Sequence, residues 1–381
     1  MEQKNQFKKD ISLENFVFIV LFFGLFSALG LKMGGTNMIM TIINTSYRLL
    51  IDVCFYIMAM SVIAGAISSL FSEFGFISTV NKLLSAFVRP LYGLPGAASL
   101  GILNCYLSDN PSILTLANED NFLSYFKKYQ IPALTNLGTS FGMGLIVTTT
   151  MMSMPVEGAV GAALVGNLGA VAGSIVSVRM MLHFTKKVYG TTDMVEVKGV
   201  ERIPENMRRI REGSHFSRFF EALLEGGQSG VQMGMAIIPG VLIICSIVMI
   251  LTHGPGPDGI YTGAEYQGIP VLPWIGEKIA PVIKPLFGFS SYEAISVPIT
   301  ALGSSGAALG VIKRMSEVGN VTGNDIAVFT AICMCWSGYL STHIAMMDAL
   351  NTRVVTSKAI LSHTVGGLCA GIAAHLLFMI F

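Results

Sequence analysis

Long runs of apolar residues dominate this chain. A transmembrane α-helix needs about 20 consecutive, mainly apolar residues. Runs of that kind predict membrane-spanning helices near residues 13–33, 47–71, 133–154, 157–184, 231–252, 324–349 and 356–381. The pattern therefore predicts an all-α, polytopic membrane protein.

Shorter apolar segments, interrupted by proline, glycine and polar residues, lie between these runs. They are found near residues 79–93, 96–118, 274–288 and 290–315. Irregular backbone does not face lipid, because each unpaired backbone group would cost several kcal/mol there. We expect broken or re-entrant helical hairpins that are buried in protein or line a polar cavity.

The composition supports a membrane location. The 381 residues are 52% hydrophobic and only 12% charged, whereas a soluble domain has about 25% charged residues. Mean hydropathy is +0.64. The net charge of +1 provides no basic face, so we expect no nucleic-acid partner. The first apolar run lacks a small-residue cleavage site and is interpreted as an uncleaved helix.

Basic residues are distributed unevenly between the loops. The stretch 185–218 carries many Lys and Arg residues, whereas the loop 253–274 carries none. Basic loops stay on the cytoplasmic side, so we expect the first stretch and the N-terminus inside. The second loop and the C-terminus are then outside an inner (cytoplasmic) membrane. Arg48 is an exception, since it falls at the outer end of the second helix.

The two halves of the chain share a pattern at an offset of about 195 residues. Residues 89–94 (Arg-Pro-Leu-Tyr-Gly-Leu) match residues 284–289 (Lys-Pro-Leu-Phe-Gly-Phe). Further matching pairs are 107–111 with 302–306, and 163–184 with 359–381. Together with the loop charges, this pattern predicts two repeats of opposite orientation in the membrane.

The predicted organisation is an N-terminal helix (1–34), a first repeat (35–187), a cytoplasmic linker (188–222) and a second repeat (223–381). Two similar halves of opposite orientation can exchange conformations, which exposes a central site to each side in turn. We therefore expect a secondary transporter for a small polar solute, not an enzyme.

The first candidate binding region is the polar part of the segment 96–118. A carboxylate such as Asp109 costs about 2.5–3.5 kcal/mol at the centre of a bilayer on insertion scales, so it marks a functional site there. Pro111 removes a backbone donor and leaves free carbonyl groups, which together with the carboxylate suit Na⁺ or H⁺. The alternative is an Asx turn in an extramembrane loop. The candidates are Asn104, Ser108, Asp109, Asn110 and Ser112.

The second candidate region is the matching tip, residues 303–306 (Gly-Ser-Ser-Gly). It fits a solute-binding tip, but also close packing of small residues. It matches the Gly-x-Ser-Gly motif of rhomboid-type intramembrane proteases as well, with Ser305 as nucleophile and His343 or His363 as base. The solute-binding candidates here are Gly303, Ser304 and Ser305.

Isolated polar residues within apolar segments complete the candidate set. They are Asn136, Thr139, Glu293, Ser337 and His343, each of which either contacts solute, bonds between helices or lies at the membrane edge. Asn167 and His363, at matching positions of the two halves, are expected to form interhelical hydrogen bonds. We expect no metal site and no cofactor beyond a candidate coupling ion, Na⁺ or H⁺.

Residues 89–98 and 288–295 resemble the nucleoside-recognition, or Gate, domain family. That family shares its architecture with concentrative nucleoside transporters and with the membrane part of the bacterial ferrous-iron transporter. The second segment is similar to the first re-entrant hairpin of the nucleoside transporters, Gly-x-x-x-x-Glu-Ala before a Gly-Gln-Thr-Glu tip, which here is Gly-Ser-Ser-Gly.

The resemblance implies a carrier whose solute is nucleoside-like, amino-acid-like or an organic acid. The spore-maturation members of the family supply the alternative, a non-transporting membrane partner protein. A homo-oligomer in the bilayer is compatible with either function.

Overall fold

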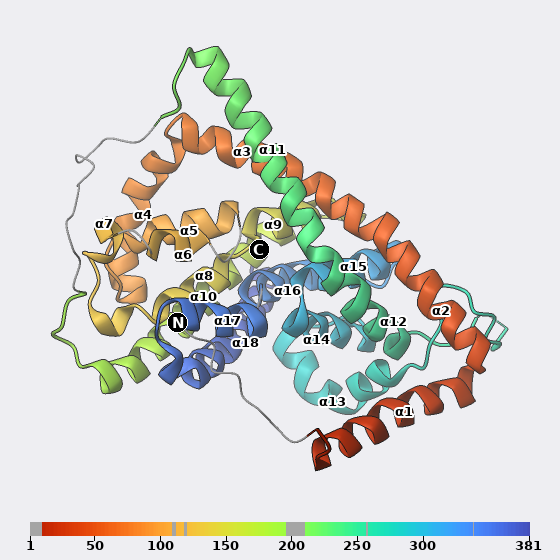
Figure 1. Cartoon of the computed structure of the whole chain (residues 1–381). Helices are drawn as coiled ribbons and strands as arrows, with labels where there is room; N and C mark the ends of the chain where they lie inside the picture. Colours follow the sequence, from red (N-terminus) through yellow and green to blue (C-terminus); the bar gives the residue numbers. More distant parts are fainter. Residues whose placement is uncertain (1–9, 109–111, 118–119, 196–209, 257, 338) are drawn as a thin grey trace.

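The protein is α-helical (Figure 1). The computed structural model describes residues 10–108, 112–117, 120–195, 210–256, 258–337 and 339–381. Within these residues, six helical segments are long and apolar enough to cross a membrane: Leu13–Met33, Gly35–Glu73, Lys128–Met152, Ala159–Tyr189, His215–Thr252 and Arg353–Phe378. The predicted all-α membrane fold is confirmed.

The first half begins with α1 (Leu13–Met33), which is largely exposed and suited to contact lipid. The elements that follow are α2 (Gly35–Arg48), a π-helical segment (Leu49–Cys54), α3 (Phe55–Glu73), α4 (Phe76–Tyr92), α5 (Ala98–Leu107), α6 (Ser112–Ala117), α7 (Asp120–Leu123), a 3₁₀ turn (Lys128–Gln130), α8 (Ala133–Phe141), α9 (Gly144–Met152) and α10 (Ala159–Tyr189).

The second half repeats this order of parts. Its elements are α11 (His215–Gly240), a π-helical segment (Val241–Cys245), α12 (Ser246–Thr252), α13 (Val271–Phe287), a 3₁₀ turn (Tyr292–Ile295), α14 (Ser296–Gly303), α15 (Ser305–Glu317), α16 (Gly323–Cys335), α17 (Tyr339–Ala349), a 3₁₀ turn (Arg353–Val355) and α18 (Thr356–Phe378). In both halves a long helix with a π-helical segment precedes a proline-containing helix, a hairpin, a broken helix and a final long helix.

The matching sequence motifs end matching helices. Gly93 follows α4 and Gly288 follows α13, both with left-handed backbone (φ 74° and 63°). The amide of Gly93 donates to the carbonyl of Arg89, and the amide of Gly288 donates to the carbonyl of Lys284. Glycine adopts this conformation without steric cost, which explains why both motifs carry it at the same position.

The long helical segments of the two halves, Gly35–Glu73 and His215–Thr252, pack against each other and run antiparallel, which is consistent with inverted repeats. In Figure 1, α3 and α11 cross at the upper edge of the molecule. Gly65 lies against Gly226 at this crossing, while Ser61, earlier in α3, lies against Gly230, later in α11. Small residues let two helix backbones approach closely without large side chains between them.

Helices α10 and α18 form the second antiparallel pair, at the centre of the molecule. Gly169 of α10 lies against Ala374 of α18, and Gly173 lies against Ala370 and Gly366. Helix α16 packs on both helices, so the core of the protein is built around this pair.

A side chain at the α10–α18 contact should weaken the fold. We expect Gly173→Val to lower the free energy of unfolding by about 1–3 kcal/mol, because the added carbons would overlap Ala370 and the carbonyl of Gly366. The control is Gly161→Val in the same helix, since nothing lies within 4 Å of the added Cβ there. Thermal unfolding in detergent measures both variants, and equal stability would contradict the close α10–α18 contact.

Two helices that the sequence predicted to be continuous are broken in the structure. The segment 133–154 is interrupted at Gly142 and Met143, where Met143 has left-handed backbone (φ 55°). The segment 324–349 is interrupted between Cys335 and Tyr339. A break at membrane depth is tolerated where the backbone is surrounded by protein. The first break meets this condition, because 94% of the most apolar part of Lys128–Met152 is buried.

Candidate functional site

A cavity of about 350 Å³ lies between the α3–α11 pair and the first hairpin, and we call it the serine-lined cavity. Its lining residues are Ser61, Gly65, Ser68, Ser69, Ser72, Asn104, Leu107, Ser108, Ser112, Ile146, Glu225, Gly226, Ser229 and Gly230. Small-molecule sites have volumes of about 300–1,000 Å³, so the cavity is large enough for a small solute.

The wall on α3 follows from the periodicity of the helix. Ser61, Gly65, Ser68 and Ser72 are three or four residues apart in turn, and Ser69 is four residues after Gly65, so all five lie on one side of the helix. This face presents hydroxyl groups, each of which can donate one hydrogen bond and accept others. Because Ser229 and Glu225 on the α11 wall are exposed, the cavity is open to the surroundings.

The wall on the first hairpin contains three of the residues predicted from sequence. Asn104 lies on α5, Ser108 follows the last residue of α5, and Ser112 begins α6. The structure therefore brings these candidates together in one cavity. Asp109 and Asn110, predicted for the same tip, lie outside the described residues.

An ion-pair cluster lies at the rim of the cavity. Arg211, from the segment before α11, contacts the lining residue Glu225 at 2.5 Å and Glu73 at 2.6 Å. Its Nη2 also donates to Ser69 Oγ at 3.4 Å. Glu73 forms a second ion pair with Arg218, at 2.6 Å. The cluster fixes the linker to the ends of α3 and α11 that border the cavity.

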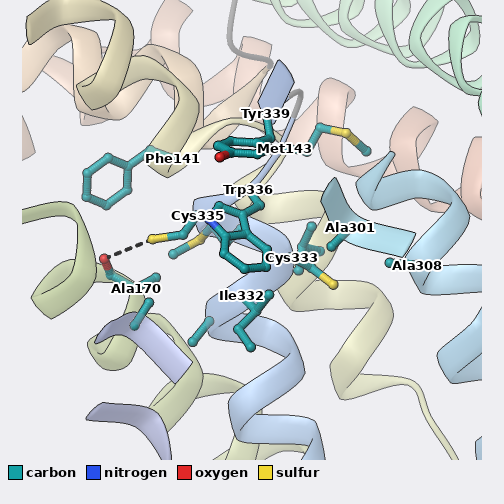
Figure 2. Close-up of a cluster of buried hydrophobic side chains, with 14 of the residues drawn as sticks. Phe141, Met143, Ala170, Ala301, Ala308, Ile332, Cys333, Cys335, Trp336 and Tyr339 are labelled. Atoms are coloured by element: carbon teal, nitrogen blue, oxygen red, sulfur yellow. Dashed lines mark hydrogen bonds between the residues drawn. The ribbon is translucent and has the colours of Figure 1, made fainter. Parts of the chain in front are cut away.

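The second hairpin tip packs against the other end of the α11 segment. An added Cβ at Gly303 would meet Ile244, and the Ser304 hydroxyl caps the start of α15. The Ser305 hydroxyl donates to the carbonyl of Cys333 at 2.8 Å. Figure 2 shows this region, with Cys333 beside Ala301 and Ala308 of the two hairpin helices. None of the described lining residues of the serine-lined cavity comes from this tip.

The described contacts do not form the serine–histidine pair that proteolysis would require. Ser305 is bonded to Cys333, whereas the ring of His363 bonds to Ser177 and to the carbonyl of Cys335. His343 packs on His363, with ring centroids 4.6 Å apart. A general base has to lie within hydrogen-bond reach of its nucleophile, and no such contact to Ser305 is present among the described residues.

Other predicted candidates lie where the broken helices meet, at the contacts of α8 with α16 and α17. The side chains of Asn136, Thr139, Ser337 and His343 are fully buried there. Thr139 donates to a carbonyl one turn earlier in its own helix. Asn136 Oδ1, Ser337 Oγ and both ring nitrogens of His343 have no hydrogen-bond partner among the described residues. A backbone group of Tyr339 lies near the His343 ring without hydrogen-bond geometry.

The imidazole of His363 is held in one tautomer. Its Nε2 lies 2.5 Å from the carbonyl of Cys335, which can only accept, so Nε2 carries the proton. Its Nδ1 then accepts from Ser177 at 2.9 Å, and Ser177 in turn accepts from Asn136 Nδ2 at 2.9 Å. Asn167, predicted at the matching position of α10, donates to Thr148 at 2.9 Å. His363 and Asn167 thus both form hydrogen bonds between helices, as predicted.

Glu293 lies away from the serine-lined cavity. It accepts a hydrogen bond from Asn320 Nδ2 at 3.1 Å. Both residues line a separate cavity of about 370 Å³, beside α13. The structure therefore places Glu293 and the first hairpin tip in different cavities.

Charged residues hold the opposite end of α3 against the second hairpin. The closed-end cluster consists of Arg48, Asp52, Glu265, Lys313, Arg314 and Glu317. Arg48 lies 3.7 Å from Asp52 and 3.6 Å from Glu265 of the loop before α13. This pairing compensates the charge of Arg48, the residue that departs from the expected loop-charge pattern.

Two cations of α15 contact the start of α3 and the loop before α13. The ammonium of Lys313 donates to the carbonyl of Asp52 and lies 4.3 Å from the ring centre of Tyr56. The guanidinium of Arg314 lies 4.8 Å from the ring centre of Tyr266. The serine-lined cavity thus lies beside the second half of α3, whereas at the start of α3 these contacts join the helix to α15 around a smaller cavity of about 190 Å³.

Several solved structures have a similar fold. A structure of CNTnw in an inward-facing substrate-bound state matches with a TM-score of 0.54 at 14% identity, over 84% of this chain and 74% of that chain. A doubly substituted CNTnw in an outward-facing state matches with a TM-score of 0.52 at 13% identity, over 97% and 85%. A singly substituted CNTnw in the intermediate 2 state matches with a TM-score of 0.51 at 14% identity, over 95% and 81%.

The chain has the fold of a concentrative nucleoside transporter. No family model matches the chain, and no curated protein matches it. The likeness is therefore one of architecture, and it fits the antiparallel pairing of α3 with α11 and of α10 with α18.

Part of the cavity wall in this transporter fold was not predicted from sequence. Most of the serine and glycine wall residues of α3 fall within the predicted apolar run 47–71, whereas the wall residues of α11 precede the predicted run 231–252. Their signal was present, because Gly226 and Gly230 have the small-xxx-small spacing of close helix contacts. Serines repeating on one face of α3 were the second signal.

Proposed function

We propose that this protein is a secondary transporter of the inner membrane that carries a small, uncharged, nucleoside-like solute. The observation that carries the proposal is the serine-lined cavity, which lies between the α3–α11 pair and the first hairpin and has exposed residues on its α11 wall. A fold built from inverted repeats can expose such a site first to one side and then to the other.

The lining favours a neutral solute with several hydroxyl or amide groups. Serine hydroxyls and the amide of Asn104 offer both donors and acceptors. The ionisable lining residue among those described, Glu225, is paired with Arg211. A charged solute would lose hydration without gaining a counter-charge, which costs more than the transfer of a neutral solute. Amino-acid-like and organic-acid solutes, which carry charges, therefore fit this lining less well than a neutral solute.

The open end is proposed to face the cytoplasm. The basic linker follows α10 and precedes α11, and the cavity lies beside the start of α11 and the end of α3. Basic loops stay inside, so this arrangement corresponds to an inward-open state. The closed-end cluster then seals the outer side.

A coupling ion, Na⁺ or H⁺, is proposed at the first hairpin tip, because Asp109 directly follows the lining residue Ser108 in the sequence. The unpartnered buried atoms of Asn136, Ser337 and His343 support a second role for the broken helices. Buried polar atoms nearly always have a hydrogen-bond partner, so we propose that these atoms contact water, an ion or the solute in another state of the protein.

Ligand stabilisation tests the proposal. Detergent-purified protein is heated with uridine, adenosine, serine or citrate, with and without Na⁺ and at two pH values. A ligand at a hundredfold excess over its Kd stabilises the folded state by about 2.7 kcal/mol. We expect uridine or adenosine to raise the midpoint of unfolding and citrate to have no effect. Stabilisation by citrate alone would contradict the proposed solute class, and no shift with any of the four would contradict the carrier.

A further inference from the structure

Arg211 belongs to the segment before α11, yet its guanidinium lies at the rim of the serine-lined cavity. Its Nε and Nη2 both donate to Glu225 Oε2, at 3.1 and 2.5 Å. Nη1 donates to Glu73 Oε2 at 2.6 Å, and Nη2 approaches the hydroxyl of Ser69 at 3.4 Å. Because Ser69 and Glu225 are lining residues, the positive charge of Arg211 is next to the space proposed for the solute.

The four charges of the described rim residues cancel. Glu73 is 3% exposed and is bonded by both Arg211 and Arg218, while Glu225 is 69% exposed and is bonded by Arg211. The pKa of Arg211 is raised above its ordinary value, first by its hydrogen bond to Glu225, so the guanidinium stays charged. Without Arg211, Arg218 would still pair with Glu73, but Glu225 would face the cavity with no ion-pair partner among the described residues.

We propose that Arg211 determines the charge selectivity of the serine-lined cavity by neutralising Glu225, so that the linker contributes a specificity residue to the solute site. The inference rests on the proposed function, since it requires that the solute binds in this cavity. It assigns Arg211 a role beyond fixing the linker to α3 and α11.

The expected effect is a change in preference and not a general loss of binding. An arginine-to-glutamine change leaves one net negative charge at the rim, which attracts a cationic solute and repels an anionic one. We expect the affinity ratio of a cationic to a neutral probe to rise about fivefold, which corresponds to about 1 kcal/mol. The ratio of an anionic to a neutral probe should fall by a similar factor.

Three probes with one scaffold separate charge from shape: uridine, 5′-amino-5′-deoxyuridine and uridine 5′-carboxylic acid. Their Kd values are measured by isothermal titration on the full-length protein at low salt. The variants are Arg211→Gln, the double variant Arg211→Gln/Glu225→Gln and the control Arg353→Gln. Arg353 also loses one charge, but it pairs with Asp348 (3.1 Å) and does not line the cavity.

The double variant distinguishes charge from mechanical attachment. Restored neutrality should return the probe ratios to those of the unsubstituted protein, although the contact between linker and α11 is lost in both Arg211 variants. If the single and the double variant show the same ratios, Arg211 only attaches the linker, and the inference is wrong. If the unsubstituted protein binds none of the three probes, the proposed function fails first, and the inference fails with it.

Discussion

Filling the serine-lined cavity should weaken solute binding at least about tenfold. Ser68→Leu replaces a lining hydroxyl on α3 by a larger apolar group, so the solute loses both space and a hydrogen-bond partner. A solute group left without its partner costs about 1–3 kcal/mol, and each 1.4 kcal/mol is a tenfold change in Kd. We expect the affinity for uridine to fall at least about tenfold, measured by isothermal titration.

The matched control makes the same change on α1. Ser27 is exposed on a helix that does not line the cavity, so Ser27→Leu should keep the affinity of the unsubstituted protein. Both variants should elute as single species from size exclusion. Uridine binding that survives Ser68→Leu unchanged would place the solute elsewhere, with the buried Asn136 and His343 region as the next candidate.

Removing Lys313 should open the closed end. Lys313→Ala deletes the contact with the Asp52 carbonyl and the cation–π contact with Tyr56. Cation–π contacts contribute about 0.5–2 kcal/mol, and hydrogen bonds of charged groups contribute about 1.5–3 kcal/mol. We therefore expect the population open at this end to rise at least about tenfold.

Two native thiols report this opening. Cys54 and Cys245 are buried, and Cys245 lies close to Gly310 of α15 at the closed end. Their rate of modification by a membrane-impermeant thiol reagent, followed by mass spectrometry, should rise in Lys313→Ala.

The buried Cys333 and Cys335, on α16, should stay protected. Lys358→Ala deletes a different cation–π contact, with Phe184, and should leave all four thiols unchanged. Equal rates in the two lysine variants would show that the closed-end cluster is not a gate.

The repeat was predictable because its matching motifs contain proline and glycine, which have strong local backbone preferences. The Pro-Leu-aromatic-Gly motifs determine where α4 and α13 end, since Gly93 and Gly288 adopt the left-handed conformation there. The long helices α10 and α18 were predictable for a second reason. A helix that crosses the bilayer needs an apolar run of a certain length, and that length can be read from the sequence.

The broken helices and the cavity depend on tertiary packing, which a single sequence does not display. Gly142 and Met143 interrupt an apolar run without proline or charge, and the break is stable only because protein surrounds it. Asn104 and Ser108 were recognised as polar residues in an apolar segment. Their partners on α3 and α11 became apparent only when the two helices were seen to cross beside them.

Uptake of radiolabelled uridine into proteoliposomes tests the carrier function most directly. Vesicles with the unsubstituted protein or Ser27→Leu should accumulate uridine under an imposed Na⁺ or proton gradient, and vesicles with Ser68→Leu should match protein-free vesicles. If uridine stabilises the unsubstituted protein but its vesicles take up no more than protein-free ones, the protein binds the solute without carrying it. That result would contradict the carrier and favour a non-transporting membrane partner.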